Sequence, residues 1–258
     1  MNMLRASVIL SGLTAALLLG QDAPPAVTSP AGAGAVASTV PNLPSTPAPR
    51  LPDGKPDLSG IWFGGGPVGD LALGLPKGEK IPLLPSAEKI MQSRLSKDDP
   101  EANCLPTGVP RTAPYPWTFA TAPGRLYMLF EGNIHSYRQI FMDGRAHPAD
   151  PNPTWYGHSI GHWEGDTLVI DTVGFNDKFW FDFRGHPHTE RLHTIERYTR
   201  KDFGTLVNQI TIDDPGAYAR PFTVTFNARL MPKGEMMEYI CQENNQDVSH
   251  IKGPAGVP

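Results

Sequence analysis

Turn sequences recur at short intervals through the second half of this chain and separate runs that are typical of β-strands. The turns are Gly132-Asn133, Glu164-Gly165-Asp166, Asp202-Phe203-Gly204 and Lys233-Gly234. Connections of this kind join neighbouring antiparallel strands. The runs that we expect to be strands are 125–131, 134–143, 158–163, 167–173, 190–200, 205–213, 222–230 and 236–243. The sequence therefore predicts a mainly β domain, an antiparallel up-and-down barrel of about eight strands, with a β-sandwich as the alternative.

A short apolar strand is also expected at 61–63, before this region. It follows Gly60 in the sequence Gly60-Ile61-Trp62, a Gly-x-Trp pattern that resembles the opening motif of lipocalin-like barrels. The resemblance implies a barrel. The same pattern also fits a core tryptophan in any β protein.

One short N-terminal helix is expected, at 85–97. Ser86 is its predicted N-cap, and Ile90, Met91 and Leu95 form its apolar stripe. The following segment, 104–123, contains repeated prolines, which indicate an extended loop without a central strand.

The two ends of the chain and its cysteines indicate export. Arg5 precedes an apolar run at 6–19 that is short for a membrane span, so 1–20 is predicted to be a signal peptide. The segment 21–50 is rich in Ala, Pro and Ser and is expected to be a disordered linker, followed by a single β domain at 51–258.

In an oxidising compartment, Cys104 and Cys241 are expected to form a disulfide, with two separate buried thiols as the alternative. We therefore expect a secreted or periplasmic protein with no membrane anchor after signal cleavage. The net charge of -4 and the pI near 6.0 argue against a nucleic-acid partner.

Side chains that carry protons are concentrated between residues 147 and 200, which hold six of the eight histidines. Imidazole titrates close to neutral pH, so a histidine beside a carboxylate can act as a general acid or base. The candidate catalytic residues are His158, His188, His193, Asp171, Asp182 and Glu190. The aromatic residues expected to bind a substrate are Trp155, Tyr156, Trp163 and Trp180.

A divalent metal is the alternative use of these side chains. In an extended chain His186, His188 and Glu190 share a face and could supply three ligands, with His193 in place of Glu190 as a variant. The pattern resembles the cupin metal motif, but Glu190 comes too soon and no second motif follows. No other cofactor is expected, because Walker, dinucleotide-binding and Gly-x-Ser-x-Gly patterns are missing from the sequence.

Three stretches resemble a large group of secreted bacterial proteins of soil and aquatic habitats, most of them without an assigned function. They are WYGHSIGHWEGDTLVIDTVGFND, HPHTERLHTIERYTR and DDPGAYARPFT. The resemblance implies an exported β-rich domain and carries over no catalytic residue.

We therefore expect an exported enzyme that hydrolyses or eliminates across a C–O bond, of the aryl ether or glycoside type, by His/carboxylate acid–base catalysis. Its partner would be a small aromatic or sugar-like substrate from plant material. A polar ladder of hydrogen bonds that merely holds loops remains open for the same residues. So do two further functions, a periplasmic protein that binds a small hydrophobic ligand without turnover and a metal-dependent hydrolase or lyase.

Overall fold

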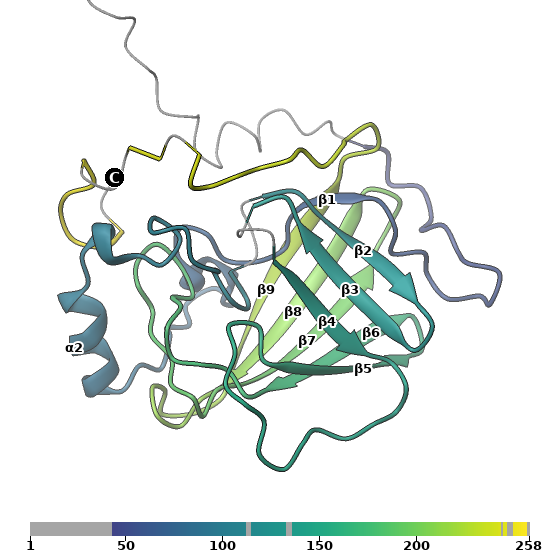
Figure 1. Ribbon diagram of the computed structural model, residues 1–258. Helices are drawn as coiled ribbons and strands as arrows, with labels where there is room; N and C mark the ends of the chain where they lie inside the picture. The colour runs from purple at the N-terminus through teal and green to yellow at the C-terminus, as the bar shows by residue number, and fades with distance from the viewer. Residues whose placement is uncertain (1–42, 112–114, 133–135, 244, 247–249, 257–258) are drawn as a thin grey trace, which may run out of the picture.

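The computed structural model describes residues 43–111, 115–132, 136–243, 245–246 and 250–256, and in this part of the chain nine strands close into a barrel in sequence order (Figure 1). The ring closes through the first strand, which pairs with both the second and the ninth. The predicted mainly β barrel is confirmed. The strands are β1 (Ile61–Gly64), β2 (Trp117–Ala122), β3 (Arg125–Phe130), β4 (Tyr137–Phe141), β5 (His158–Glu164), β6 (Thr167–Val173), β7 (His193–Arg200), β8 (Thr205–Asp213) and β9 (Phe222–Leu230), and the helices are η1 (Leu71–Gly74), α2 (Pro85–Ser93) and η2 (Ser96–Asp98).

One neighbouring pair in the barrel, β4 and β5, is parallel, and all the others are antiparallel. A closed ring of an odd number of strands cannot alternate in direction at every step, so one pair has to be parallel. Parallel neighbours need a crossover, because the chain must return to the same end of the sheet. Residues 142–157 form that crossover, which the prediction of about eight antiparallel strands did not contain.

The predictions for two segments were wrong. The proline-rich segment contains β2, because Pro116 and Pro123 lie just outside the strand and leave its ladder intact. Residues 236–243 form no strand, and the chain there runs over the outside of the barrel. In consequence Lys233-Gly234 is not a hairpin turn.

The helix is shorter than expected and begins differently. Leu84 occupies the N-cap position without a side-chain hydrogen bond, and Pro85 starts the helix, so Ser86 is not the cap. The expected apolar stripe is not buried either. Ile90 is 49% exposed, whereas Ala87 on another face is 2% exposed and contacts the core. Packing through a small residue lets the helix backbone lie close to the domain.

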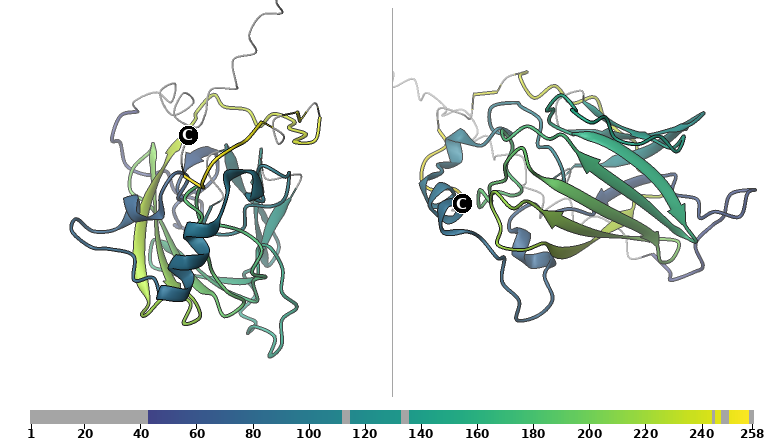
Figure 2. Two further views of the ribbon diagram at one scale, coloured as in Figure 1. Left: turned by 90° about the vertical axis from the view of Figure 1, so that its left-hand side faces the viewer. Right: turned by 90° about the horizontal axis from the view of Figure 1, so that it is seen from below.

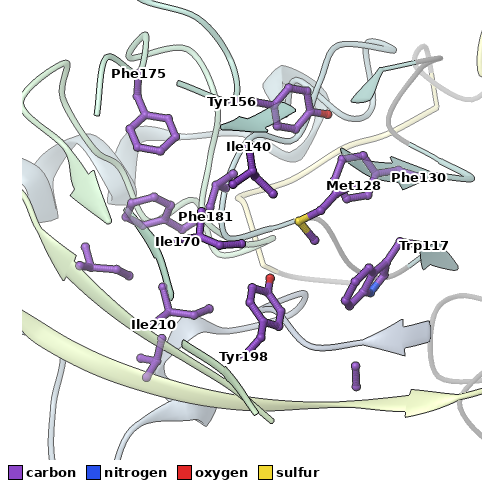
Figure 3. Packing of buried hydrophobic residues seen from close by; sticks show 14 of the residues in the cluster. Trp117, Met128, Phe130, Ile140, Tyr156, Ile170, Phe175, Phe181, Tyr198 and Ile210 are labelled. Carbon is purple, nitrogen blue, oxygen red and sulfur yellow. The ribbon is translucent and has the colours of Figure 1, made fainter. Parts of the chain in front are cut away.

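Side chains from opposite walls of the barrel meet in its interior (Figure 3). Among them is a buried ion pair in which Arg138 of β4 lies 2.5 Å from Glu196 of β7. Arg138 also donates to the hydroxyls of Ser159 and Thr172, and Tyr198 donates to Glu196. The barrel interior around Glu196 is therefore filled by packed apolar groups and a hydrogen-bonded ion pair, whose partners offset each other's desolvation.

Loops and α2 cover one end of the barrel, as the left view of Figure 2 shows. The segment 174–192 places Phe175, Phe179 and Phe181 in the core. The predicted disulfide between Cys104 and Cys241 is confirmed and ties the C-terminal segment to this cover. In this segment the carbonyl of Gly253 accepts a hydrogen bond from the backbone of Ser96.

The expected signal peptide, 1–20, and most of the expected linker lie outside the described residues. The last part of that linker is ordered, because Leu43 packs against the core and Thr46 accepts a backbone hydrogen bond from Phe203. The ordered domain thus begins before Leu51. The helices among the described residues are too short or too polar to cross a membrane.

Candidate functional site

The crossover between β4 and β5 builds a cleft on the outer wall of the barrel. The two parallel strands are in register only at Ile140↔Ser159 and Phe141↔Ile160. Among the described residues, the start of β4 therefore pairs with no strand on this side, and the crossover returns beside it. The cleft has a volume of about 540 Å³. It is lined by Pro106, Ser136, Tyr137, Gln139, Phe141, Pro148, Pro151, Asn152, Thr154, Trp155, Tyr156, Gly157, His158 and Ser159.

A chain of hydrogen bonds leads from the cleft wall to the outer face of β7. Nδ1 of His158 lies 2.8 Å from Nδ1 of His147, which belongs to the crossover. Nε2 of His147 lies 3.0 Å from Oδ1 of Asp171, and Nε2 of His193 approaches the same oxygen to 2.8 Å. Strand alternation explains the grouping, since the three strand residues lie on the outward faces of the adjacent strands β5, β6 and β7.

With His147 in its neutral form, the hydrogen bonds define one tautomer for each ring. A carboxylate only accepts, so His147 and His193 each donate Nε2–H to Asp171. Nδ1 of neutral His147 then accepts the Nδ1–H of His158, which leaves the lone pair of His158 on Nε2. In the described part of the chain, Nε2 of His158 has no hydrogen-bond partner. The arrangement presents a proton acceptor at the cleft.

The surroundings keep His158 neutral at neutral pH. Burial is the main cause that lowers the pKa of His158 below its ordinary value, and the neighbouring His147 and Arg145 add to it, because a positive charge on either opposes one on His158. Burial opposes ionisation of Asp171, but the hydrogen bonds from His193 and His147 outweigh it and hold the pKa of Asp171 below its usual range. The bond to Asp171 raises the pKa of His193.

Phe141 packs against the face of the His158 ring. The two rings stack with their centroids 5.1 Å apart and their planes at 24°. The guanidinium carbon of Arg145 lies 3.9 Å from the Phe141 centroid, and Arg145 is held by Asp143 through contacts of 2.6 to 3.1 Å. The imidazole is thus supported by packing as well as by hydrogen bonds.

A pair of hydroxyls lies on the same cleft wall. The Tyr156 hydroxyl is 2.7 Å from that of Ser136. Burial raises the pKa of Tyr156 to about 12, so this phenol keeps its proton across the neutral range. The cleft therefore offers a proton donor in addition to the acceptor on His158.

The structure brings five of the residues predicted from the sequence together around the cleft. They are Trp155, Tyr156, His158, Asp171 and His193. Two predicted tryptophans lie elsewhere. Trp163 is on β5 beneath Lys55, and Trp180 is in the cover of the barrel beneath Arg94.

The remaining predicted residues form a separate group in the segment 174–192. The buried Asp182 carboxylate accepts hydrogen bonds from Nδ1 of His186 at 2.6 Å and from the backbone of Leu71 at 2.6 Å. His188 is 5% exposed, and burial lowers its pKa to about 4. Glu190 is exposed. This group closes the end of the barrel and does not reach the cleft residues.

The three residues predicted as metal ligands are not brought together, because His186 pairs with Asp182 while Glu190 points to solvent. Among the described residues, one group of potential ligand atoms lies within 4.8 Å of one another, those of Asp70, Asp182 and His186. Asp70 already accepts from the backbone of Ala72, and Asp182 has the donors described above. Hydrogen bonds from the protein therefore already engage both carboxylates.

Among the residues of the site that sequence reasoning missed are His147 and Phe141. His147 lies in a loop, where no periodicity relates it to a strand. Phe141 could have been found, since it alternates with Tyr137 and Gln139 on one face of β4.

No family model, curated protein or solved structure matches this chain. The resemblance of its three stretches to secreted bacterial proteins stays a prediction, and the functional argument depends on the cleft.

Proposed function

We propose that this protein is a lyase or hydrolase that cleaves a C–O bond of an aryl ether or glycoside type of substrate, with His158 as the general base. The observation that carries the proposal is the chain His158–His147–Asp171, which ends in a free imidazole nitrogen on the wall of an aromatic cleft. A base of this kind contributes about 10²- to 10⁴-fold to a rate.

Of the two reactions, elimination fits the cleft better. Hydrolysis of a glycoside by carboxylates needs a pair of them on either side of the bond. None of the described residues that line the cleft carries a carboxylate. In an elimination, Nε2 of His158 takes a proton from carbon, the C–H electron pair forms a C=C bond, the neighbouring C–O bond breaks, and the Tyr156 hydroxyl protonates the leaving oxygen.

When His158 takes up a proton, its positive charge is stabilised through His147 by the Asp171 carboxylate. The same hydrogen bonds fix the orientation of the ring, which a base requires before the reaction begins. Trp155, Tyr137 and Phe141 supply flat apolar walls for a ring-shaped substrate.

The proposal includes export to the periplasm or the medium. A disulfide supports this, because such bonds persist in oxidising compartments.

Incubation with mixed aryl ethers and glycosides in water enriched in heavy oxygen tests the reaction. Elimination yields an unsaturated product without the label, whereas hydrolysis introduces labelled oxygen, and mass spectrometry distinguishes the two. His158→Gln should lower the rate by about 10²-fold or more. Binding without any product would contradict catalysis and indicate a carrier for the same ligands.

A further inference from the structure

The cleft combines uncharged walls with cationic groups at its rim. Apart from tyrosines, His158 is the one titratable side chain among the described residues that line it. Two guanidinium groups lie over the ring of Phe141, that of Arg145 at 3.9 Å and that of Arg125 at 5.4 Å from the ring centroid. A chain of net charge -4 thus places positive charge beside the proposed base.

The two arginines differ in what they already bind. Arg145 is held by Asp143, which contacts its Nε and one terminal nitrogen. Arg125 is the cross-strand neighbour of Phe141 on the outward face, and no carboxylate pairs with it among the described residues. A contact with an aromatic face leaves the planar N–H donors of a guanidinium available for an anion.

From this geometry we propose that the substrate is acidic and that Arg125, supported by Arg145, binds its carboxylate at the Phe141 end of the cleft. This inference rests on the proposed function and specifies its substrate class, a ring compound with a carboxylate next to the carbon that loses its proton. Either a uronate glycoside or an aryloxy carboxylic acid meets that description.

An acidic substrate also suits elimination. A guanidinium bound to the carboxylate offsets the negative charge that builds up when the neighbouring C–H proton moves to His158. The electron pair then forms the C=C bond and releases the oxygen on the next carbon, which takes the Tyr156 proton. Gln139 and Asn152 in the cleft can bind the hydroxyl or ether oxygens of the same ring.

The test compares each acid with its methyl ester, which keeps the shape and removes the charge. The probes are a digalacturonate, which represents the uronate glycosides, and a β-aryloxypropionate, which represents the aryloxy carboxylic acids. The variant is Arg125→Gln, and the matched control is Arg197→Gln, an arginine on the outer face of β7 paired with Glu164. Binding is measured by calorimetry and turnover by the appearance of the unsaturated product.

At low ionic strength we expect the protein to favour one of the acids over its ester by about 10- to 100-fold, the usual worth of hydrogen bonds to a charged group. Arg125→Gln should abolish this preference by weakening acid binding and leaving ester binding unchanged, and Arg197→Gln should retain it. Equal handling of acid and ester by the native protein would overturn the inference. So would an equal loss of both in Arg125→Gln, which indicates a structural role.

The two proposals fail in different ways. Preferential, Arg125-dependent binding of an acid without product would leave the inference standing and contradict the proposed function. Product formed equally well from acid and ester would support the function and contradict the acidic substrate.

Discussion

At the scale of single residues, Asp171 controls the proposed base although it does not line the cleft. It accepts hydrogen bonds from two imidazoles, and only through His147 does it reach His158. In the proposed mechanism its negative charge would stabilise the proton that His158 takes up. Asp171 is therefore a positioning residue, and its removal should change the pH dependence as well as the rate.

We predict that Asp171→Asn lowers kcat by about 10-fold or more, since an amide lacks the charge that stabilises protonated His158. In the native protein kcat/KM should rise with pH through a pKa below 6.5 and stay level above it, because the base must be neutral. Asp171→Asn should move this limb to lower pH. The matched control is Glu164→Gln, an exposed carboxylate 3.1 Å from His162 on the same sheet. An unchanged pH profile in Asp171→Asn would contradict the influence of Asp171 on His158 through His147.

The burial of His188 leads to a prediction about the stability of the protein at low pH. Its ring centroid lies 3.8 Å from that of Phe179, and burial lowers its pKa to about 4 from the ordinary 6.5. The unfolded chain binds this proton more tightly than the folded chain, so stability is complete above pH 6.5 and falls as the pH drops towards 4. The difference amounts to roughly 3 kcal/mol of unfolding free energy.

Replacement of His188 by Phe should remove this acid-dependent loss, because the new ring cannot bind a proton and can still stack between Phe179 and Phe181. Denaturant unfolding at a series of pH values measures it. The exposed His162→Gln serves as the control. An unchanged slope between pH 6.5 and 4 in His188→Phe would show that other groups cause the loss.

At the scale of elements, the crossover 142–157 links the topology to the site. It exists because β4 and β5 are parallel, and it delivers His147, Trp155 and Tyr156 to the outer face of the barrel. Its return into β5 passes through Gly157, which has a φ of +63°. A Cβ at this position would lie 2.7 Å from both Thr172 Cγ2 and the Val173 carbonyl oxygen.

We predict that Gly157→Ala lowers the unfolding free energy by about 1 to 3 kcal/mol and weakens ligand binding in the cleft. Gly144→Ala is the matched control in the same crossover. It has a φ of +78° but nothing within 4 Å of its would-be Cβ, so it should cost only about 1 to 2 kcal/mol for the backbone and leave binding intact. Calorimetric unfolding and ligand titration give both quantities. Equal effects of the two substitutions would show that the close contact at Gly157 is relieved locally.

At the scale of the whole molecule, the disulfide joins the loop that contains Cys104 to the C-terminal segment that contains Cys241. Cys104 and Cys241 are 137 residues apart, and the bond closes a loop that includes most of the barrel. It also holds the C-terminal segment over the segment that contains Arg111, whose buried guanidinium binds Asp99 and Glu101.

We predict that the double replacement of Cys104 and Cys241 by Ala lowers the unfolding free energy by about 4 to 5 kcal/mol, since the unfolded chain gains the freedom of an open loop. Urea denaturation measures the loss. Turnover at a temperature where the variant is folded should be retained, because most of the residues that line the cleft belong to β4 and the crossover. A loss below about 1 kcal/mol would mean that the C-terminal segment contributes little to the domain.

Much of the barrel could be predicted because local patterns decide it. The expected strands 167–173, 205–213 and 222–230 coincide with β6, β8 and β9, whose alternation and flanking turns are contained within a few residues. The disulfide followed from the presence of only two cysteines. The segment 104–123 was misread, because prolines that bound a strand and prolines that exclude one look alike in sequence.

The site divides in the same way. The sequence by itself determined which residues are available, and it placed His158, Asp171 and His193 on outward-facing strand positions that an alternating pattern specifies. Only the tertiary structure decided that Asp182, His186 and His188 belong to the cover of the barrel, and that His147 completes the chain at the cleft. The physical reason is topological. Whether a ring of strands is odd or even depends on all of its members, and the parallel pair that this parity demands creates the crossover in which His147 lies.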